Sequence, residues 1–411
     1  MTDGTHRSIV LGLTGGIAAF KSAELVRHLA AANIGVQVVM TDAATRFVSP
    51  ITLQALSGMP VFTDLWDDRV GNAMAHIDLS RSAALVVVAP ATADFLAKLA
   101  LGLADDLLST LCLARECPLL VAPAMNRRMW EHPATQRNLE RLRSDGVQIV
   151  GPDAGAQACG ETGMGRMVEA DVISRSVVAA LAPKVLAGLR VMVTAGPTFE
   201  RIDAVRGITN SSSGRMGYAV AEAAVEAGAI VTLVSGPTAL PVPNGVSSLQ
   251  RVVSAQDMFE AVDSRLSACD VFISVAAVAD YTPRAPHARK LKKSDATLTL
   301  ELVPTRDILA HVAGRPDAPF CVGFAAESEN LEAFAEAKRR RKGIPLLAAN
   351  LAQDAIGAES SELLLLDDDG QHRLVHAPKI IQARLLIAHL ARLLGSQAQA
   401  RAVHSNGVRN A

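Results

Sequence analysis

Short apolar runs recur along the chain, and the segments between them have the spacing of amphipathic helices. The runs cover residues 9–13, 85–89, 119–122, 147–150, 191–195, 230–234, 271–275 and 346–349. A run that is apolar at nearly every position, rather than at every second one, is typical of a strand buried on both faces of a sheet. Such strands alternating with helices predict an α/β fold built on mainly parallel sheets.

The pattern of strand, glycine-containing turn and helix begins twice, at the N-terminus and again near residue 190. A helix is predicted over residues 170–182, and Pro183 and Gly188 mark a short connector after it. The chain of 411 residues is also longer than the ~250–300 residues over which one core usually grows. We therefore predict two doubly wound domains in tandem, residues 1–189 and 190–394, and a disordered tail over residues 395–411.

The second half carries two further strand patterns. Polar and apolar residues alternate over residues 297–303, as in a half-buried strand. Residues 362–366 and 373–376 flank an acidic turn that ends in Gly370, which predicts a β-hairpin.

The composition excludes several classes of protein. With 40 basic and 41 acidic side chains, the chain lacks the positive excess of a nucleic-acid-binding protein. No apolar run reaches the ~20 residues that a membrane-spanning helix needs, and no signal-peptide pattern precedes the first strand. The five cysteines are scattered without paired metal spacing, which favours a reducing cytoplasm. Small molecules are therefore the expected partners.

Polar residues and glycines follow three predicted strands of the first half: Thr14, Gly15, Gly16, Thr41, Thr92 and Asp94. Ligands of open parallel sheets bind at the carboxyl ends of the strands, so these loops are expected to converge on one mononucleotide. The glycine turn alone fits a phosphate site and a tight packing turn equally well, and it lacks the dinucleotide fingerprint.

Three other segments are harder to explain as scaffold. They are residues 74–79 with His76, residues 122–130 with Asn126, and the glycine-rich residues 157–166 with Cys159. A lone histidine or cysteine is usually structural, but here each stands in a segment whose composition does not suit a core. The order Gly-Gly-Ile-Ala-Ala-x-Lys, Pro-Ala-Thr-Ala-Asp, Pro-Ala-Met-Asn-x-x-Met-Trp and Ala-Cys-Gly-Glu resembles the phosphopantothenoylcysteine decarboxylases.

That resemblance implies a flavodoxin-like domain that binds FMN near a subunit interface and forms trimers. It places His76 in the active site, Asn126 on the substrate carboxylate, and Cys159 as the proton donor to the intermediate. It also implies an FMN site made of Thr14, Gly15, Gly16, Thr41, Thr92, Asp94 and Ser109. In this chemistry a transient two-electron oxidation yields a thioaldehyde, whose electron demand permits loss of CO₂ before the ene-thiol is reduced again.

The second half opens with a strand and a loop rich in small polar residues. Residues 206–217 contain Arg206, Asn210 and three serines before a glycine and a helix, which together offer many N–H and hydroxyl donors to a polyphosphate. A serine-rich turn is more often merely a loop, and the later cluster Lys290, Lys292 and Lys293 is a solvated surface in most proteins. Their position after buried strands favours a site.

Residues 190 to about 380 resemble the bacterial phosphopantothenate–cysteine ligases, and decarboxylase before ligase is the bacterial bifunctional order. The resemblance implies a Rossmann-like domain that uses CTP and Mg²⁺ to form an acyl-cytidylate, from which cysteine displaces CMP. It assigns the acyl-cytidylate step to Arg206 and Asn210. The CTP site it implies contains Ser274, Val275, Ala276, Asp280, Lys290, Arg306, Asp307, Ile308, Leu309, Phe324, Lys338 and Lys342.

Two positions depart from the ligase pattern, because Ala204 and Arg306 stand where prolines are usual. The metal ligands are not predicted, beyond Mg²⁺ held through the CTP phosphates. The resemblance also implies a homo-oligomer with trimeric flavin domains and paired ligase domains, for which a dodecamer is one arrangement, and the exact oligomer size stays open. A flavoprotein regulator without turnover and an NAD-dependent dehydrogenase are the alternatives, and the choice between CTP and ATP stays open.

Overall fold

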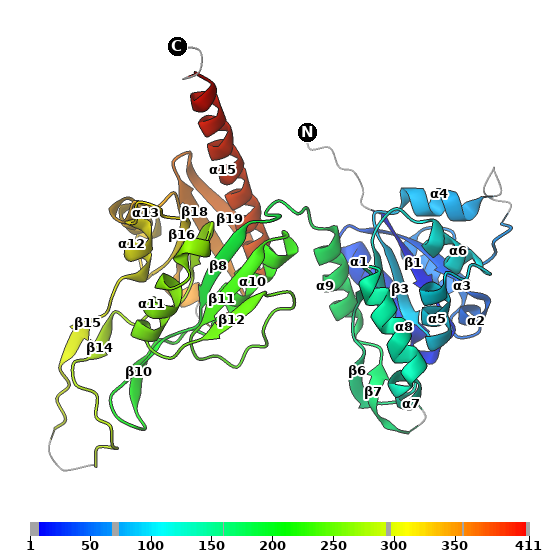
Figure 1. Ribbon diagram of the computed structural model, residues 1–411, viewed down its shortest axis with the longest axis horizontal. Coiled ribbons are helices and arrows are strands. Elements are labelled where there is room, and N and C mark those ends of the chain that lie inside the picture. Colours follow the sequence, from blue (N-terminus) through cyan, green and yellow to red (C-terminus); the bar gives the residue numbers. More distant parts are fainter. Residues whose placement is uncertain (1–7, 68–73, 159, 293–296, 356, 408–411) are drawn as a thin grey trace. The chain divides into compact units, whose positions relative to one another are not determined.

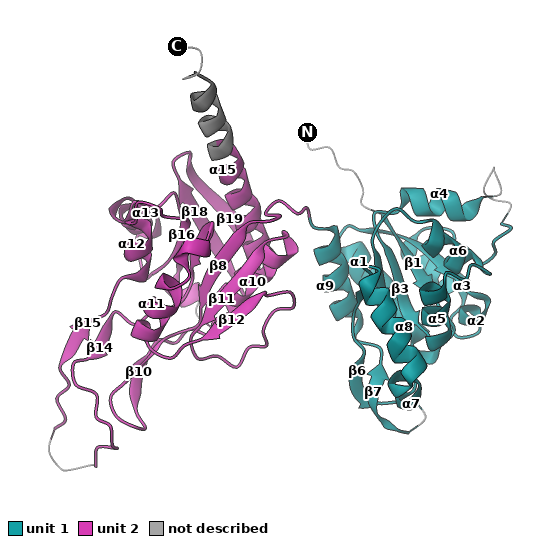
Figure 2. Ribbon diagram, viewed as in Figure 1, with its two compact units in different colours: residues 1–182 teal, residues 183–411 magenta. Residues whose placement is uncertain are grey.

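The computed structural model describes residues 8–67, 74–158, 160–292, 297–355 and 357–407, with side chains as far as residue 396 (Figure 1). The chain forms two compact units, residues 1–182 and residues 183–411 (Figure 2). The predicted boundary lay seven residues later, at 189/190. The connector belongs to unit 2 because Leu186 is fully buried in its core and donates its N–H to the Ala227 carbonyl at 2.9 Å.

Unit 1 contains a five-stranded sheet in which all strands are parallel, as predicted. Its order is β2 (Gly35–Met40), β1 (Ser8–Leu13), β3 (Val86–Ala91), β4 (Leu119–Pro123) and β5 (Gln148–Ile149). This is the flavodoxin-like order 2-1-3-4-5.

Helices cover both faces of that sheet (Figure 1). Alternate strand residues face opposite sides, so Leu11 packs in one core cluster and Val10 in the other. The first cluster includes α1 (Lys21–Ala31), α3 (Pro50–Ser57) and α9 (Ala170–Leu181). The second includes α4 (Ala75–Ser82), α5 (Ala93–Leu101), α6 (Leu107–Ala114) and α8 (Pro133–Ser144). The short elements are η1 (Ile17–Phe20), α2 (Asp42–Thr45), α7 (Arg127–Glu131) and the hairpin β6 (Asp153–Ala156) and β7 (Thr162–Arg166).

Unit 2 contains an eight-stranded sheet. Its six parallel strands are β12 (Ser248–Arg251), β11 (Ile230–Ser235), β8 (Arg190–Ala195), β13 (Val271–Ser274), β16 (Phe320–Glu327) and β17 (Leu346–Leu351). Numbered by their order in the chain, they run 3-2-1-4-5-6, the Rossmann order. The antiparallel pair β18 (Ser360–Asp367) and β19 (Gly370–Pro378) extends the edge and confirms the hairpin predicted around Gly370.

Helices again cover both faces of the unit 2 sheet. One cluster includes α10 (Arg215–Glu226) and α15 (Lys379–Gly407), and the other includes α11 (Ala255–Asp263), α12 (Ile308–Ala313) and α13 (Leu331–Lys342). Two small antiparallel pairs lie apart from the sheet, β9 (Phe199–Arg201) with β10 (Gly207–Thr209), and β14 (Tyr281–Pro283) with β15 (Leu302–Pro304). The remaining elements are η2 (Leu266–Ala268) and α14 (Ala352–Ala355).

Two predictions about unit 2 differ from the structure. The alternating segment 297–303 forms a strand only in β15, and residues 297–301 have no regular structure. The last helix continues to Gly407, through most of the segment 395–411 for which disorder was predicted. Residues 397–402 of that segment are all glutamine, alanine or arginine, which are good helix formers. Within the described residues, no helix has the length and hydrophobicity needed to cross a membrane.

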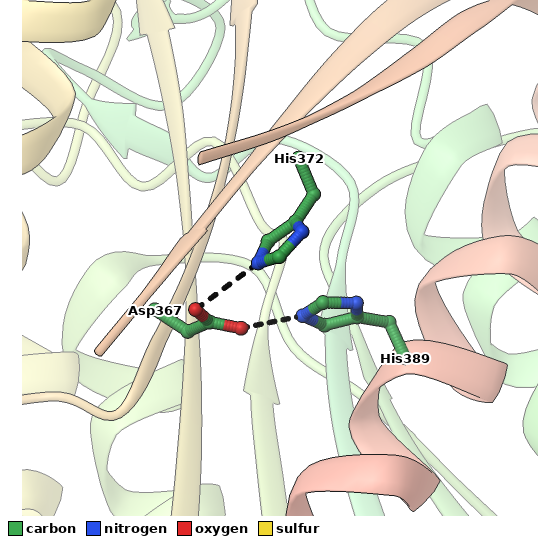
Figure 3. A group of neighbouring side chains, drawn as sticks. All are labelled: Asp367, His372 and His389. Atoms are coloured by element: carbon green, nitrogen blue, oxygen red, sulfur yellow. Dashed lines mark hydrogen bonds and ion pairs between the residues drawn. The ribbon is translucent and has the colours of Figure 1, made fainter. Parts of the chain in front are cut away.

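An ion-pair cluster ties the β18–β19 turn to the last helix (Figure 3). The Asp367 side chain is 1% exposed; its Oδ2 lies 2.6 Å from His389 Nε2 and its Oδ1 lies 3.2 Å from His372 Nε2. The guanidinium of Arg392 lies 3.3 Å from the same carboxylate. Asp367, His372 and His389 could together surround a metal ion. Because Arg392 already places a positive charge there, we interpret the cluster as a structural ion-pair network.

We expect Asp367→Asn to destabilise unit 2 by about 2 kcal/mol at neutral pH, because it removes the buried carboxylate that pairs with His372, His389 and Arg392. Burial raises the pKa of Asp367, but the two histidines and the Asp369 N–H outweigh it and hold the pKa below its ordinary value. A depressed carboxyl pKa contributes stability above the unfolded value, ~4, and that stability is lost as the pH falls below it. Thermal unfolding from pH 7 to pH 3 should therefore show the difference between wild type and variant shrinking towards acid. A constant difference would contradict this.

Candidate functional sites

The first site lies where β1 and β3 of unit 1 are neighbours. This is the switch point of the 2-1-3-4-5 order, and ligands bind outside the carboxyl ends of strands at such points. Thr14 directly follows β1 and is 2% exposed. Its hydroxyl donates to the Pro90 carbonyl at 2.8 Å and accepts the N–H of Thr92 at 3.0 Å. One buried threonine therefore holds together the loops that follow the two strands.

The glycine turn after Thr14 has the close approach expected of a phosphate loop. A side chain on Gly15 would clash with Ala43 in α2, whereas a Cβ on Gly16 would meet Thr92 at an ordinary 3.7 Å. Among the described residues, the N–H groups of Gly15 and Gly16 donate no hydrogen bond, and both residues are partly exposed. Two free donors in a backbone cradle fit a phosphate group.

The other predicted FMN residues divide into two groups. The Thr41 N–H donates to the Leu13 carbonyl at 3.0 Å, which brings Thr41 beside the end of β1, and Thr92 caps α5. By contrast, the Asp94 side chain is 80% exposed and lies 4.0 Å from Lys98. The Ser109 side chain is buried in a capping box with Asp106 at the start of α6. The structure therefore gathers the three threonines and the glycine turn, while the Asp94 and Ser109 side chains have partners elsewhere.

Asn126 lies in the loop after β4, at the residue that precedes α7, and its side chain makes hydrogen bonds in both directions. Its Oδ1 accepts the Arg128 N–H at 2.8 Å and caps α7. Its Nδ2 donates to Gln157 Oε1 at 3.3 Å and to Glu161 Oε2 at 3.0 Å. Both partners lie at the tip of the β6–β7 hairpin. The sequence analysis assigned the glycine-rich residues 157–166 to this site through Cys159. Only the structure shows that Gln157 and Glu161 contact Asn126.

His76 lies on α4, which packs on α6 and β1. Its Nδ1 is buried and has no hydrogen-bond partner among the described residues. A buried polar atom without a partner costs free energy unless a ligand or another molecule satisfies it. No hydrogen bond among the described residues links His76 to Asn126. Cys159, the predicted proton donor, lies outside the described residues.

The second site lies where β8 and β13 of unit 2 are neighbours, the switch point of the Rossmann order. The loops after these strands are bonded, since the Ala277 N–H donates to the Gly196 carbonyl at 3.0 Å. Asn210 Nδ2 donates to the Ala277 carbonyl at 2.8 Å, so Asn210 lies beside the predicted nucleotide loop 274–276. The sequence analysis missed Thr198, which is fully buried and accepts the Ala279 N–H at 3.0 Å. Its place in a Gly-Pro-Thr turn after a buried strand was the available signal.

The start of α10 is packed against the end of β8. Gly214 has a left-handed backbone, φ 78°, and its missing side chain lets it approach Gly196, where a Cβ would lie 3.2 Å from the Gly196 Cα. A Cβ on Gly217 would lie 2.5 Å from the Ala195 Cβ. These contacts bring the N-terminus of a 12-residue helix to the switch point, where its N–H groups favour negative charge.

Arg206 links two loops of unit 2 through its guanidinium. Its Nε donates to Asp203 Oδ2 at 3.0 Å, and its Nη2 donates to the Leu291 carbonyl at 2.9 Å. The Leu291 N–H donates to the same Asp203 oxygen at 3.1 Å. The Asp203 side chain is fully buried, and the Arg206 guanidinium, with backbone N–H groups, holds the pKa of its carboxyl well below the usual range. This network fixes the backbone beside Lys290, whose own side chain is exposed.

Three predicted nucleotide residues come together around the ends of α12 and α13. Lys342 Nζ lies 2.7 Å from Asp307 Oδ1, and its side chain is 13% exposed. Burial raises the pKa of Asp307, but Lys342 and the N–H of Ala310 outweigh it and lower the pKa overall. Burial lowers the pKa of Lys338, and the charges of Asp280 and Lys342 both act on it. Lys338 and Lys342 therefore lie close together, and the nearby carboxylates neutralise their positive charge only in part.

The remaining predicted nucleotide residues differ in what their side chains can reach. Ile308 and Leu309 are 4% and 6% exposed and belong to the hydrophobic core, so only their backbone could meet a nucleotide. Phe324 is half-buried on β16. The Arg306 guanidinium stacks on the Phe259 ring at 4.8 Å. Arg306 also lines a cavity of about 570 Å³ between β9, the start of α11 and the β14–β15 pair. None of the other predicted nucleotide residues lines this cavity.

Comparisons with known proteins agree with this division into two units. Residues 1–182 match the Flavoprotein family, and residues 186–394 match the family described as DNA/pantothenate metabolism flavoprotein C-terminal domain. The chain is 47% identical over 374 residues to the coenzyme A biosynthesis bifunctional protein CoaBC of Vibrio cholerae serotype O1, covering 90% of this chain and 94% of that protein. It is 46% identical over 389 residues to the protein of the same name from Escherichia coli K12, covering 93% and 96% of the two chains.

Among solved structures, the chain resembles the C-terminal domain of a CoaBC protein with 40% identity and a TM-score of 0.45, covering 52% of this chain and 99% of that one. The assignment rests on the two bifunctional relatives, which are 46–47% identical along nearly the whole of both chains, and on a matching family for each unit. The chain belongs to the family of bifunctional coenzyme A biosynthesis proteins, in which a flavoprotein domain precedes a pantothenate-metabolism domain.

Proposed function

We propose that the chain carries out two successive steps of coenzyme A biosynthesis. Unit 2 would join cysteine to 4′-phosphopantothenate with consumption of CTP, and unit 1 would decarboxylate the resulting 4′-phosphopantothenoylcysteine to 4′-phosphopantetheine with FMN. The observation that carries the proposal is a near-full-length match to bifunctional relatives, combined with one polar site at the switch point of each sheet.

FMN fits the residues of the first site. The free N–H groups of Gly15 and Gly16 would receive its phosphate, and the threonine-linked loops would frame it. When bound, FMN would supply the reversible two-electron oxidation of the cysteine carbon that bears sulfur. Asn126 would hold the substrate carboxylate through a neutral amide, which orients the group without stabilising its charge strongly enough to oppose loss of CO₂. Residues His76 and Cys159 are proposed to act on the bound substrate, with Cys159 as the proton donor.

The second site fits activation of a carboxylate. A carboxylate is a poor electrophile, so its oxygen would attack the α-phosphorus of CTP and expel pyrophosphate, and the cysteine amine would then displace CMP. Asn210 and the start of α10 would receive charge on the reacting groups. Lys338 and Lys342 would neutralise the departing pyrophosphate, with Mg²⁺ bound mainly through the phosphates. Because Arg206 is bonded to Asp203 and Leu291, we assign it the positioning of the segment that carries Lys290.

We expect Lys290→Gln to lower pyrophosphate release about tenfold or more while CTP binding changes less. Lys290 is exposed. We assign it to the negative charge that grows on the departing pyrophosphate, so its loss should slow the reaction more than it weakens binding of the nucleotide. The control is Lys292→Gln, which removes an equally exposed charge two residues away. Equal rates for the two variants would show that Lys290 contributes only general positive charge.

We further propose a cytoplasmic location and a homo-oligomeric assembly. Four of the five cysteines are described and free, which supports a reducing, cytoplasmic environment. Trimeric flavin domains with paired ligase domains are proposed from the family resemblance.

One experiment tests the whole proposal. The protein is incubated with 4′-phosphopantothenate, cysteine, CTP and Mg²⁺, and the products are identified by mass, with ATP in place of CTP as a second arm. We expect CMP, pyrophosphate and 4′-phosphopantetheine, from a protein that absorbs in the blue. A yellow protein that makes no product would favour a flavoprotein regulator. A colourless protein that oxidises substrates with NAD would favour a dehydrogenase.

A further inference from the structure

The side-chain amide of Asn126 is already occupied by a carboxylate that belongs to the chain itself. An Asn side chain offers one acceptor and two N–H donors. Here the acceptor caps α7 through the Arg128 N–H at 2.8 Å, and the two donors face Gln157 at 3.3 Å and Glu161 at 3.0 Å. A substrate carboxylate can therefore bind Nδ2 only by replacing one of those two acceptors.

Gln157 and Glu161 are not equally replaceable. Gln157 Oε1 also accepts the Arg127 N–H at 3.0 Å, and its Nε2 donates to the Met164 carbonyl at 3.1 Å. Gln157 is thus built into the base of the hairpin tip. The Glu161 carboxylate contacts Asn126 and is only partly buried. It also has the same chemistry as the group that the substrate presents, and two carboxylates on one donor repel each other.

We propose that Glu161 is an internal stand-in for the substrate carboxylate, displaced when substrate binds and returning to Asn126 once CO₂ has left. The inference rests on the proposed role of Asn126. The substrate competes with Glu161, whereas the decarboxylated product, which has no carboxylate, does not. Glu161 would thereby weaken substrate binding, leave product binding unaffected, and refill the amide after each turnover. It is a residue that sets the balance between substrate and product, not a catalytic residue.

The size of the effect follows from the competition. If the site is open in only a fraction of molecules, the apparent affinity falls to that fraction of the intrinsic affinity. A hydrogen bond to a charged group is stronger than one between neutral groups, and solvent weakens it at a partly exposed site. We therefore expect removal of Glu161 to tighten binding of a carboxylate ligand by about tenfold.

The test compares two ligands that differ only in the carboxylate. They are 4′-phosphopantothenoylserine, in which a hydroxyl replaces the reactive thiol, and the corresponding amide of ethanolamine. Binding to the full-length, flavin-loaded protein is followed by the change in flavin absorbance, which reports unit 1 alone. The variants are Glu161→Ala, Glu161→Gln and, as a control, Glu131→Ala. Glu131 is a nearby carboxylate, 53% exposed, that pairs with Arg127 rather than Asn126.

We expect Glu161→Ala to lower the Kd of the serine ligand about tenfold and to leave the Kd of the ethanolamine ligand within twofold. Glu161→Gln should lie between, because its amide oxygen still accepts from Asn126. Glu131→Ala should change neither value. An unchanged or higher Kd for the serine ligand in Glu161→Ala overturns the inference, and so does an equal shift for both ligands, which indicates a loosened hairpin.

A further variant, Asn126→Ala, separates this inference from the proposed function. If Asn126→Ala still distinguishes the serine ligand from the ethanolamine ligand, Asn126 does not bind the carboxylate and the proposed function of that residue fails. If the distinction disappears in Asn126→Ala but Glu161→Ala shows no gain, the role of Asn126 stands and only the stand-in role of Glu161 fails.

Discussion

The variant Asn126→Asp is expected to lose the decarboxylase reaction and to keep the ligase reaction. The substitution preserves the shape of the side chain and the acceptor that caps α7 at the Arg128 N–H, so the local fold should survive. It replaces the donor Nδ2 by an oxygen and adds a negative charge where a substrate carboxylate must bind. Two unit charges 4 Å apart repel by about 4 kcal/mol at an effective dielectric of ~20. We expect kcat/KM for 4′-phosphopantothenoylcysteine to fall ~10²–10³-fold.

The same substitution places a carboxylate within 3.0 Å of Glu161, so the hairpin tip should also be released from α7. The decisive measurement is the rate of 4′-phosphopantetheine formation from purified 4′-phosphopantothenoylcysteine, with flavin content as the control for folding. The ligase rate of the same sample provides a second control, because no residue of unit 2 is altered. A decarboxylase rate within threefold of wild type would refute the role of Asn126.

The reciprocal result is expected for Asn210→Asp, which should stop amide formation and leave the decarboxylase reaction intact. Asn210 Nδ2 donates to the Ala277 carbonyl at 2.8 Å, and an aspartate would set one oxygen against another there. Residues 206–217 would lose this bond to the loop after β13, and a negative charge would face the carboxylate that is being activated. By the same Coulomb estimate, we expect amide formation to fall ~10²–10³-fold.

Binding of CTP should change much less, because Lys338 and Lys342 on α13 are untouched. Calorimetry with CTP and Mg²⁺ measures that binding, and mass spectrometry measures 4′-phosphopantothenoylcysteine. The variant Asn210→Ala removes the hydrogen bond without adding charge and should lose only about tenfold. If the alanine and aspartate variants were equally impaired, the repulsion argument would be wrong and the hydrogen bond alone would matter.

Much of the fold is predictable from the sequence for a local reason. Runs such as residues 191–195 are apolar on both faces, and only a strand inside a helix-covered parallel sheet buries them completely. The turn around Gly370 was predictable because its residues are adjacent in the chain. The domain boundary was not, because Leu186 belongs to unit 2 through packing on distant residues that no local pattern reveals. The order of the strands in each sheet is likewise a non-local property.

The sequence by itself determined which residue types stand after the buried strands, and so the class of ligand at each site. Only the tertiary structure decided their partners. It bonded Thr14 to the loop after β3, bonded Arg206 to Asp203 and Leu291, and brought Glu161 onto Asn126. The physical reason is that a motif specifies local backbone and chemistry, whereas a hydrogen bond between segments 35 or 78 residues apart depends on the topology that brings them together.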